Sequence, residues 1–101
     1  CDVIAIPAAF TRPTGAAHWH VMQRARAIEA SAFVVAAAQV GRHADGRETY
    51  GHSLVIDPWD EVLLDMGGDE PGLAFAELDP GRIATVRAQL PSLANKRPIP
   101  A

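Results

Sequence analysis

Two apolar runs on either side of one helical segment constrain this chain more than any other feature. The first run, "DVIAIPAAF" at 2–10, has the β-branched content of a buried strand and ends at the loop "TRPTG". The second run, "AFVVAAAQVG" at 32–41, has the same character. The order strand, helix, strand predicts a parallel pair joined by a crossover helix, in a sheet that is covered on both faces.

The intervening helix is predicted to start at Thr14, whose hydroxyl can accept a hydrogen bond from the first free N–H groups. Apolar residues then recur at helical spacing, which predicts that they form its buried face: Val21, Ala25 and Ile28, with Met22 beside them.

Beyond Gly41, the polar stretch "RHADGRETYG" predicts a loop with a glycine turn. "HSLVIDPWDEVLLDMG" at 52–67 then predicts a hairpin around "DPWD". Pro58 suits the second position of a tight turn, and Asp60 can take a left-handed conformation there. These features predict two antiparallel strands after the crossover unit.

The final third predicts one more strand and a helix. "GLAFAELD" at 72–79 is interpreted as a third strand, and Asp79 as the cap of the helix "PGRIATVRAQL" with Pro80 at its first position. The tail "PSLANKRPIPA" is broken by prolines. The inner face of the helix is predicted to hold Ile83, Val86 and Leu90.

Composition narrows the function classes. A length of 101 residues allows one core, and nine Lys and Arg against twelve Asp and Glu, a net charge of −3, provide no basic surface for nucleic acid. The longest apolar run, "AFVVAAAQV", is too short to cross a bilayer, so we expect no membrane and a cytoplasmic location. Because the chain starts inside an apolar run without a methionine, we expect it to be a fragment of a longer protein.

Cys1 is the single cysteine and a candidate nucleophile. No His, Lys or Arg lies near it in the sequence to lower its pKa, so it is predicted to be inert. Ser53 lacks the glycine frame of a nucleophile elbow. The sequence therefore predicts no catalytic set within these residues.

The histidines do not predict a metal site, and no cofactor is expected. His18 and His20 flank Trp19 and would point about 200° apart on a helix, so they cannot hold one ion together. His43 and His52 have no second cysteine or carboxylate cluster beside them in the sequence. Other notable side chains have structural interpretations: Arg26 with Glu29 as an ion pair, and Trp19 and Trp59 as core or turn-covering aromatics.

Four motifs taken together resemble a known family: "TGAAHWH", "RARAIE", "AAAQVGRH" and "YGHSLVIDPW". They are similar to the C-terminal part of the carbon-nitrogen hydrolase (nitrilase) superfamily, in the Nit branch typified by deaminated glutathione amidase. The branch often has Glu at the position of His20 and Gly at that of Asp60.

The resemblance implies an α/β fold in which residues 1–101 form the C-terminal part of a four-layered αββα sandwich, with the N-terminal portion absent. It implies hydrolysis of a small amide, like deaminated glutathione, through a cysteine thioester. The Glu, Lys and Cys of the family triad lie upstream, so the resemblance implies that Cys1 is not the nucleophile. Family members are generally dimers or larger, so we expect a homo-oligomer.

The substrate is expected outside the carboxyl ends of the parallel strands. This places Phe10, Thr11, Thr14 and His18 as predicted pocket residues, although Phe10 can instead fill the core and Thr14 can simply cap. Alternatives for the function are an ω-amidase, another amidase of the superfamily, and a non-catalytic fragment or interaction module.

Overall fold

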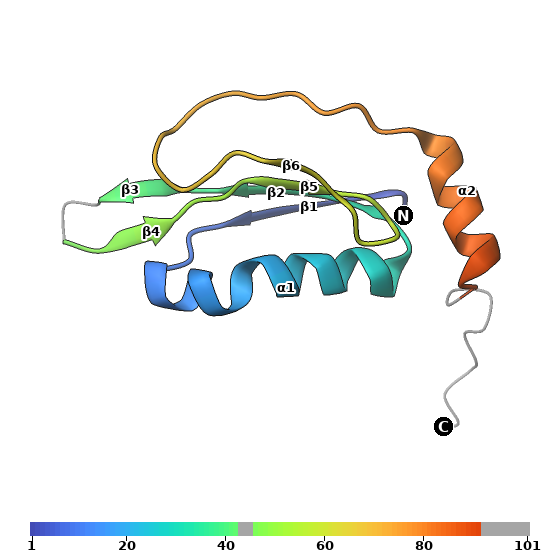
Figure 1. Ribbon diagram of the computed structural model, residues 1–101, viewed down its shortest axis with the longest axis horizontal. Helices are drawn as coiled ribbons and strands as arrows, with labels where there is room; N and C mark the ends of the chain where they lie inside the picture. The colour runs from blue at the N-terminus through green and yellow to red at the C-terminus, as the bar shows by residue number, and fades with distance from the viewer. Residues whose placement is uncertain (43–45, 92–101) are drawn as a thin grey trace, which may run out of the picture.

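A four-stranded sheet with one long helix against it organises the molecule (Figure 1). The computed structural model describes residues 1–42 and 46–91. The elements are β1 (Val3–Ala8), α1 (Arg12–Ala30), β2 (Phe33–Ala38), β3 (Val40–Arg42), β4 (Glu48–Tyr50), β5 (Leu54–Ile56), β6 (Val62–Asp65) and α2 (Pro80–Gln89). None of the described helices is long and apolar enough to span a membrane.

The sheet has the strand order β1-β2-β5-β6. β1 pairs with β2 in parallel, from Val3 opposite Phe33 to Ala8 opposite Ala38, which confirms the predicted parallel crossover unit. β2 pairs with β5, and β5 with β6, in antiparallel register. β3 and β4 form a separate two-stranded sheet. The stretch at 42–51 that is predicted as a polar loop thus contains β4. This strand was not predicted because it is short and its residues do not alternate between apolar and polar.

Helix α1 begins earlier than predicted. Thr11 is its N-cap residue, with an extended backbone, and Thr14 lies exposed within the first turn, so the prediction that Thr14 caps the helix is wrong. Proline is tolerated in the first turn because its missing N–H would have no partner there, so Pro13 belongs to the helix and not to a loop. Ser31 ends the helix in a left-handed conformation with φ 49°.

The buried positions of α1 recur every four residues: Gly15, Trp19, Gln23 and Ala27. The predicted buried face is wrong, because Val21, Met22 and Ile28 are exposed and Ala25 is half-buried. Small residues let the helix approach the strands closely. A Cβ added at Gly15 would lie 2.3 Å from the Cβ of Tyr50, which shows how tightly α1 packs on β4.

The core lies between α1 and the sheet. Its buried side chains are Trp19, Ala27, Val34, Ala36, Leu54 and Ile56. Trp19 is 1% exposed, which confirms its interpretation as a core aromatic.

The predicted hairpin around "DPWD" is confirmed by the β5–β6 pair. Asp57 Oδ1 accepts hydrogen bonds from the backbone N–H groups of Trp59 and Glu61, each at 2.9 Å, and so closes the turn. Asp60 adopts the left-handed side of the backbone map, with φ 100°, as predicted.

After β6 the chain crosses the sheet face opposite α1 without forming a strand (Figure 1). The predicted strand at 72–79 is wrong, and its apolar side chains Leu73 and Phe75 are 82% and 86% exposed. A strand needs a hydrogen-bonding neighbour, and this segment lies away from the edge of β6. The prediction that the sheet is covered on both faces is therefore also wrong for the described residues.

Helix α2 starts as predicted, since Asp79 Oδ1 accepts a hydrogen bond from the N–H of Gly81 at 2.9 Å. Ile83 and Val86 are buried, but Leu90 is 42% exposed because it is the C-cap residue at the outer end of the helix. The tail predicted to be broken by prolines lies, from residue 92 onward, outside the described residues.

Candidate functional site

The carboxyl ends of β1 and β2 border three hollows that share Gln39. One has a volume of about 540 Å³ and is lined by residues 7–9 and 37–39. A second, about 400 Å³, is lined by residues 37–40, 51–53, 66–67 and 70–72. The smallest, about 130 Å³, is lined by Ala9, Thr11, Gln39, Arg47 and Thr49. Ligands bind at this edge of a parallel strand pair in many α/β proteins, so these hollows are the first candidates for a substrate site.

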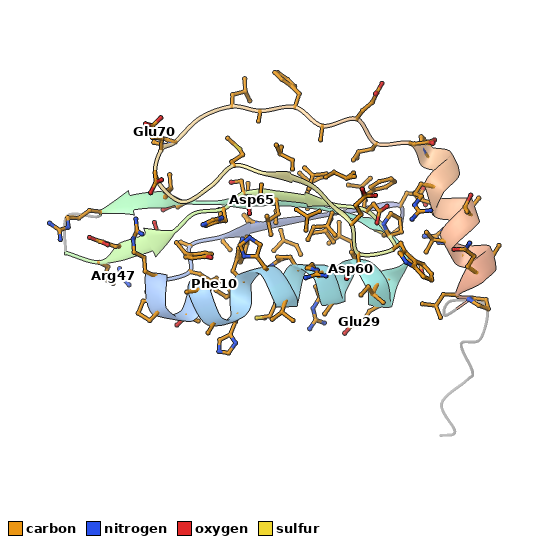
Figure 2. The ribbon with its side chains drawn as sticks, viewed as in Figure 1. Phe10, Glu29, Arg47, Asp60, Asp65 and Glu70 are labelled. Atoms are coloured by element: carbon orange, nitrogen blue, oxygen red, sulfur yellow. The ribbon has the colours of Figure 1, made fainter. Side chains whose placement is uncertain are left out.

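The four predicted pocket residues occupy different surroundings. Thr11 lines the smallest hollow, and its side chain is within hydrogen-bond distance of the Thr14 hydroxyl, 3.2 Å away. Phe10 lies between α1 and the sheet, with its ring 5.0 Å from that of Trp19 in an edge arrangement (Figure 2). Thr14 and His18 are exposed on α1 and line none of the three hollows. The structure therefore brings one of the four, Thr11, to a hollow at this edge.

Cys1 lies far along β1 from these hollows, at the amino end of the strand. It is exposed, and its thiol contacts the carbonyl oxygen of Val3 at 3.2 Å. The fold brings the Arg87 guanidinium to the Cys1 backbone, where it donates a hydrogen bond to the carbonyl oxygen at 2.7 Å, a cation that the local sequence did not place there. That Cys1 is not the nucleophile stays a prediction.

Three side chains from distant parts of the chain form a second polar site, the His-Asp-His cluster of His20, His52 and Asp65. His20 Nε2 lies 2.8 Å from Asp65 Oδ2, and His52 Nδ1 lies 2.8 Å from Asp65 Oδ1. His20 comes from α1, His52 from the link between β4 and β5, and Asp65 from the end of β6. Figure 2 shows Asp65 at the sheet.

Neighbouring groups hold the cluster in place. Trp19 Nε1 donates a hydrogen bond to the carbonyl oxygen of His52 at 2.7 Å, and the Tyr50 ring stacks on the His52 ring with centroids 4.3 Å apart. The backbone N–H of Gly67 donates to Asp65 Oδ1 at 2.9 Å. These contacts restrain the His52 imidazole through a core residue and a strand residue, and the Asp65 carboxylate through the backbone just after β6.

Opposing effects act on the Asp65 carboxyl. Its partial burial raises the pKa, but hydrogen bonds from His20, the Gly67 N–H and His52, with the charge of His52, outweigh burial and hold the pKa below its ordinary value. Asp65 is therefore a carboxylate at neutral pH.

Sequence reasoning missed this cluster because it compared histidines that are neighbours in the chain. His18 and His20 do diverge, but the fold pairs His20 with His52, a residue of a different element. The hairpin register was the usable signal: Leu54 faces Asp65, so the predicted hairpin already placed His52 beside the end of β6. The packing of α1, which brings in His20, was predicted on the wrong face.

Two further ion pairs fix the "DPWD" turn. Arg24 of α1 binds both carboxylate oxygens of Asp60, at 2.6 and 2.7 Å. Arg82 of α2 binds Asp57 Oδ2 at 3.0 Å. Burial raises the pKa of Asp57, but hydrogen bonds from the Glu61 N–H, Arg82 and the Trp59 N–H, together with the Arg82 charge, lower it by more, so the net pKa lies below its ordinary value. The predicted pair of Arg26 with Glu29 is confirmed at 2.9 Å.

Comparisons with known proteins identify the family. The carbon-nitrogen hydrolase model matches residues 2–88. Over 95 residues the chain is 50% identical to a deaminated glutathione amidase of Synechocystis, covering 94% of this chain and 35% of that protein. The human deaminated glutathione amidase is 45% identical over 97 residues, which is 96% of this chain and 29% of the relative.

Among solved structures, the NitFhit protein of C. elegans superimposes with a TM-score of 0.88 at 42% identity, covering 96% of this chain and 23% of that one. The expected α/β fold, part of an αββα sandwich, is thereby confirmed. The chain spans about a third of the length of the curated relatives it matches. With its fold and most of its residues matched to one family, the chain belongs to the carbon-nitrogen hydrolases.

Proposed function

We propose that the protein to which this chain belongs is an amidase that hydrolyses a small amide of the deaminated glutathione type. The observation that carries the proposal is the 50% identity to a deaminated glutathione amidase, spread over 95 residues and not confined to one motif. Identity of this extent covers the strands, α1 and the "DPWD" turn together, so it reflects a shared scaffold around the substrate.

The reaction proceeds by acyl transfer to a cysteine and then to water. A cysteine thiolate attacks the amide carbonyl carbon and the C–N bond then breaks. The amine leaves after it takes up a proton from a general acid, and the acyl group remains on the cysteine as a thioester. Water then attacks the thioester, the C–S bond breaks, and the acid and the free thiol are released. The family resemblance assigns these steps to a Glu, a Lys and a Cys that lie outside residues 1–101.

This chain contributes the wall of the pocket. Phe10, Thr11, Thr14 and His18 are the proposed substrate-binding residues, and their support is that they follow the carboxyl end of β1. Thr11 has the strongest support because it lines a hollow there. Phe10 contributes indirectly: its ring packs on Trp19 and so holds the backbone that positions Thr11 at the hollow.

The test uses the longer protein that contains this chain, assayed with deaminated glutathione and with simple ω-amides. We expect turnover of deaminated glutathione with the higher kcat/KM. Phe10→Ala is expected to lower kcat/KM several-fold in a folded protein, because substrate positioning is lost. The kcat/KM values of Thr11→Val and Thr14→Val, when compared, show whether the hydroxyl that lines the hollow matters more than the exposed one. Preference for an ω-amide would reassign the substrate, and no amide hydrolysis would overturn the proposal.

The same assay addresses residues 1–101 alone. We expect no turnover from this chain by itself, because it lacks the triad that the family chemistry requires. Turnover that disappears in Cys1→Ser would contradict this expectation and make Cys1 the nucleophile.

A further inference from the structure

The His-Asp-His cluster has the donor set of a transition-metal site. Two imidazole nitrogens and a carboxylate are ligands that Zn²⁺, Co²⁺ and Ni²⁺ accept, whereas Mg²⁺ and Ca²⁺ prefer oxygen alone. The ligand atoms that His20, His52 and Asp65 offer all lie within 4.8 Å of one another. The cluster therefore meets the first requirement of a site, which is several suitable donors within reach of one ion.

The spacing needs only a small adjustment to accept a cation. Two donors on a tetrahedral zinc ion at about 2.1 Å are about 3.4 Å apart. Each histidine nitrogen now lies 2.8 Å from a carboxylate oxygen, so the side chains must separate by about half an ångström. We expect a small movement of the His20 side chain, which is 32% exposed, to supply most of this change. The solvent-facing side remains for a water molecule as a fourth ligand.

The Asp65 carboxylate is open to a cation. Within the described residues its partners are the two histidines and a backbone N–H, and 34% of its side chain is exposed. A metal ion that binds here therefore displaces no Lys or Arg of the described residues from the carboxylate.

The supporting contacts are those of a preformed site. The stack on Tyr50 and the hydrogen bond from Trp19 fix His52, and the Gly67 N–H fixes Asp65, as outer groups do around known metal ligands. The His20 and His52 side chains are 32% and 24% exposed, so an ion can reach them from solvent.

We propose that His20, His52 and Asp65 bind one divalent transition-metal ion, with Zn²⁺ as the fitting probe, and that the ion ties α1 to the β5–β6 hairpin. The role is structural: the three ligands come from three elements, so one ion cross-links the helix to the sheet beside Trp19. His52 also lines the hollow of about 400 Å³ that is a candidate substrate site, so the proposal is tested by metal binding and stability and not by amide hydrolysis.

Calorimetric titration of the chain with Zn²⁺ tests the proposal, and Mg²⁺ serves as the comparison ion. We expect one Zn²⁺ per chain and no measurable heat with Mg²⁺. His20→Gln and His52→Asn keep an N–H donor to Asp65 but remove the imidazole, so each is expected to weaken Zn²⁺ binding at least tenfold, and the double variant to abolish it. His18→Gln is the matched control on the same helix and is expected to leave the affinity unchanged.

A measurement on the unaltered chain covers the case in which a variant fails to fold. The imidazole nitrogen resonances of His20 and His52 are expected to shift together as Zn²⁺ is added, while those of His18 stay in place. Zn²⁺ is also expected to raise Tm in the unaltered chain and not in the folded double variant. Absence of Zn²⁺ binding, unchanged affinity in the double variant, or shifts confined to other histidines would overturn the proposal and leave the cluster as an ion pair only.

Discussion

The two faces of the four-stranded sheet are made of similar residues but lie in opposite surroundings. Val34 and Val35 are neighbours in β2; Val34 faces α1 and is fully buried, whereas Val35 faces the other way and is 36% exposed. The same division runs through β1, where Ile4 and Ile6 are half-buried and Val3, Ala5 and Pro7 are exposed. An apolar run without polar alternation is typical of a strand that is buried on both faces. Here the described residues cover the second face only in part, since Val55, which pairs with Val35, is 8% exposed and lines a hollow together with residues 72–74.

The segment between β6 and α2, which runs along the open face, also leaves apolar side chains exposed. Leu73 and Phe75 are more than 80% exposed, and the segment that contains them runs on the side of the sheet away from α1 (Figure 1). Large apolar surfaces of this kind mark contacts with other protein surface. We therefore propose that the open face is an interface; the matched relatives are about three times as long as this chain.

The largest expected effect is on assembly. We predict that the 101-residue chain alone associates at micromolar concentration into dimers or larger species through the open face, because association buries apolar surface that the single chain leaves exposed. Sedimentation velocity at micromolar concentration measures this. Val35→Lys is expected to shift the distribution to monomers, and Val21→Lys, the same change on the outer surface of α1, to leave it unaltered.

A folded monomer that unfolds cooperatively at micromolar concentration would break the comparison, because the chain would then close its core unaided. Dissociation by Val21→Lys instead would move the interface to α1.

The next largest effect concerns two aromatics. Trp19→Ala is expected to cost about 3–5 kcal/mol of the free energy of unfolding, because it empties the centre of the covered side. Phe75→Ala is expected to change it by less than about 0.5 kcal/mol in this chain. Urea unfolding at one fixed chain concentration measures both. In the longer protein the cost of Phe75→Ala is expected to rise, and an unchanged cost there would mean that nothing covers this segment.

The covered side was also the side where sequence reasoning succeeded least. Both strands and the parallel pairing followed from β-branched content, but the buried face of α1 did not follow from its apolar residues. A glycine, a tryptophan, a glutamine and an alanine face the strands, since small residues permit close approach and Trp19 fills the space that remains. The spacing of apolar residues alone predicts Val21 and Ile28 as buried positions, because it takes no account of how closely the helix packs on the strands.

The turns were better predicted than the segments between elements. "DPWD" and the Asp79 cap succeeded because an Asp side chain binding backbone N–H groups within four residues is a local device. The strand expected at 72–79 failed because pairing needs a neighbour that local sequence cannot supply. The His-Asp-His cluster was not predicted for the same reason, because it depends on α1 lying against the β5–β6 hairpin.

Acid is expected to weaken the connection between α2 and the sheet. The pKa of Asp57 is lower in the folded chain than in the unfolded one, so its contribution is complete above about pH 4 and is lost as pH falls through the folded pKa. Asp57→Asn is expected to cost about 1–3 kcal/mol at neutral pH, because the pair with Arg82 is lost. The difference from the unaltered chain should narrow below about pH 4.

The control for this effect is Asp2→Asn, an exposed carboxylate whose change is expected to shift the free energy of unfolding by less than about 0.5 kcal/mol. A penalty for Asp57→Asn that stays constant down to pH 2 would show that Asp57 acts through the shape of the turn and not through its charge.

The smallest expected difference is also the most direct test of the two faces. Val34→Ala and Val35→Ala remove the same two methyl groups from adjacent residues of β2, so backbone position and chemistry are matched and only the covering differs. We expect Val34→Ala to cost about 2 kcal/mol and Val35→Ala about 1 kcal/mol or less in this chain under conditions where it is monomeric. When the open face is covered, in an oligomer or in the longer protein, the two costs should converge because Val35 then loses its contact with water. Equal costs in the monomer would mean that Val35 is already packed, and a persistent gap in the covered state would mean that the cover does not reach the centre of β2.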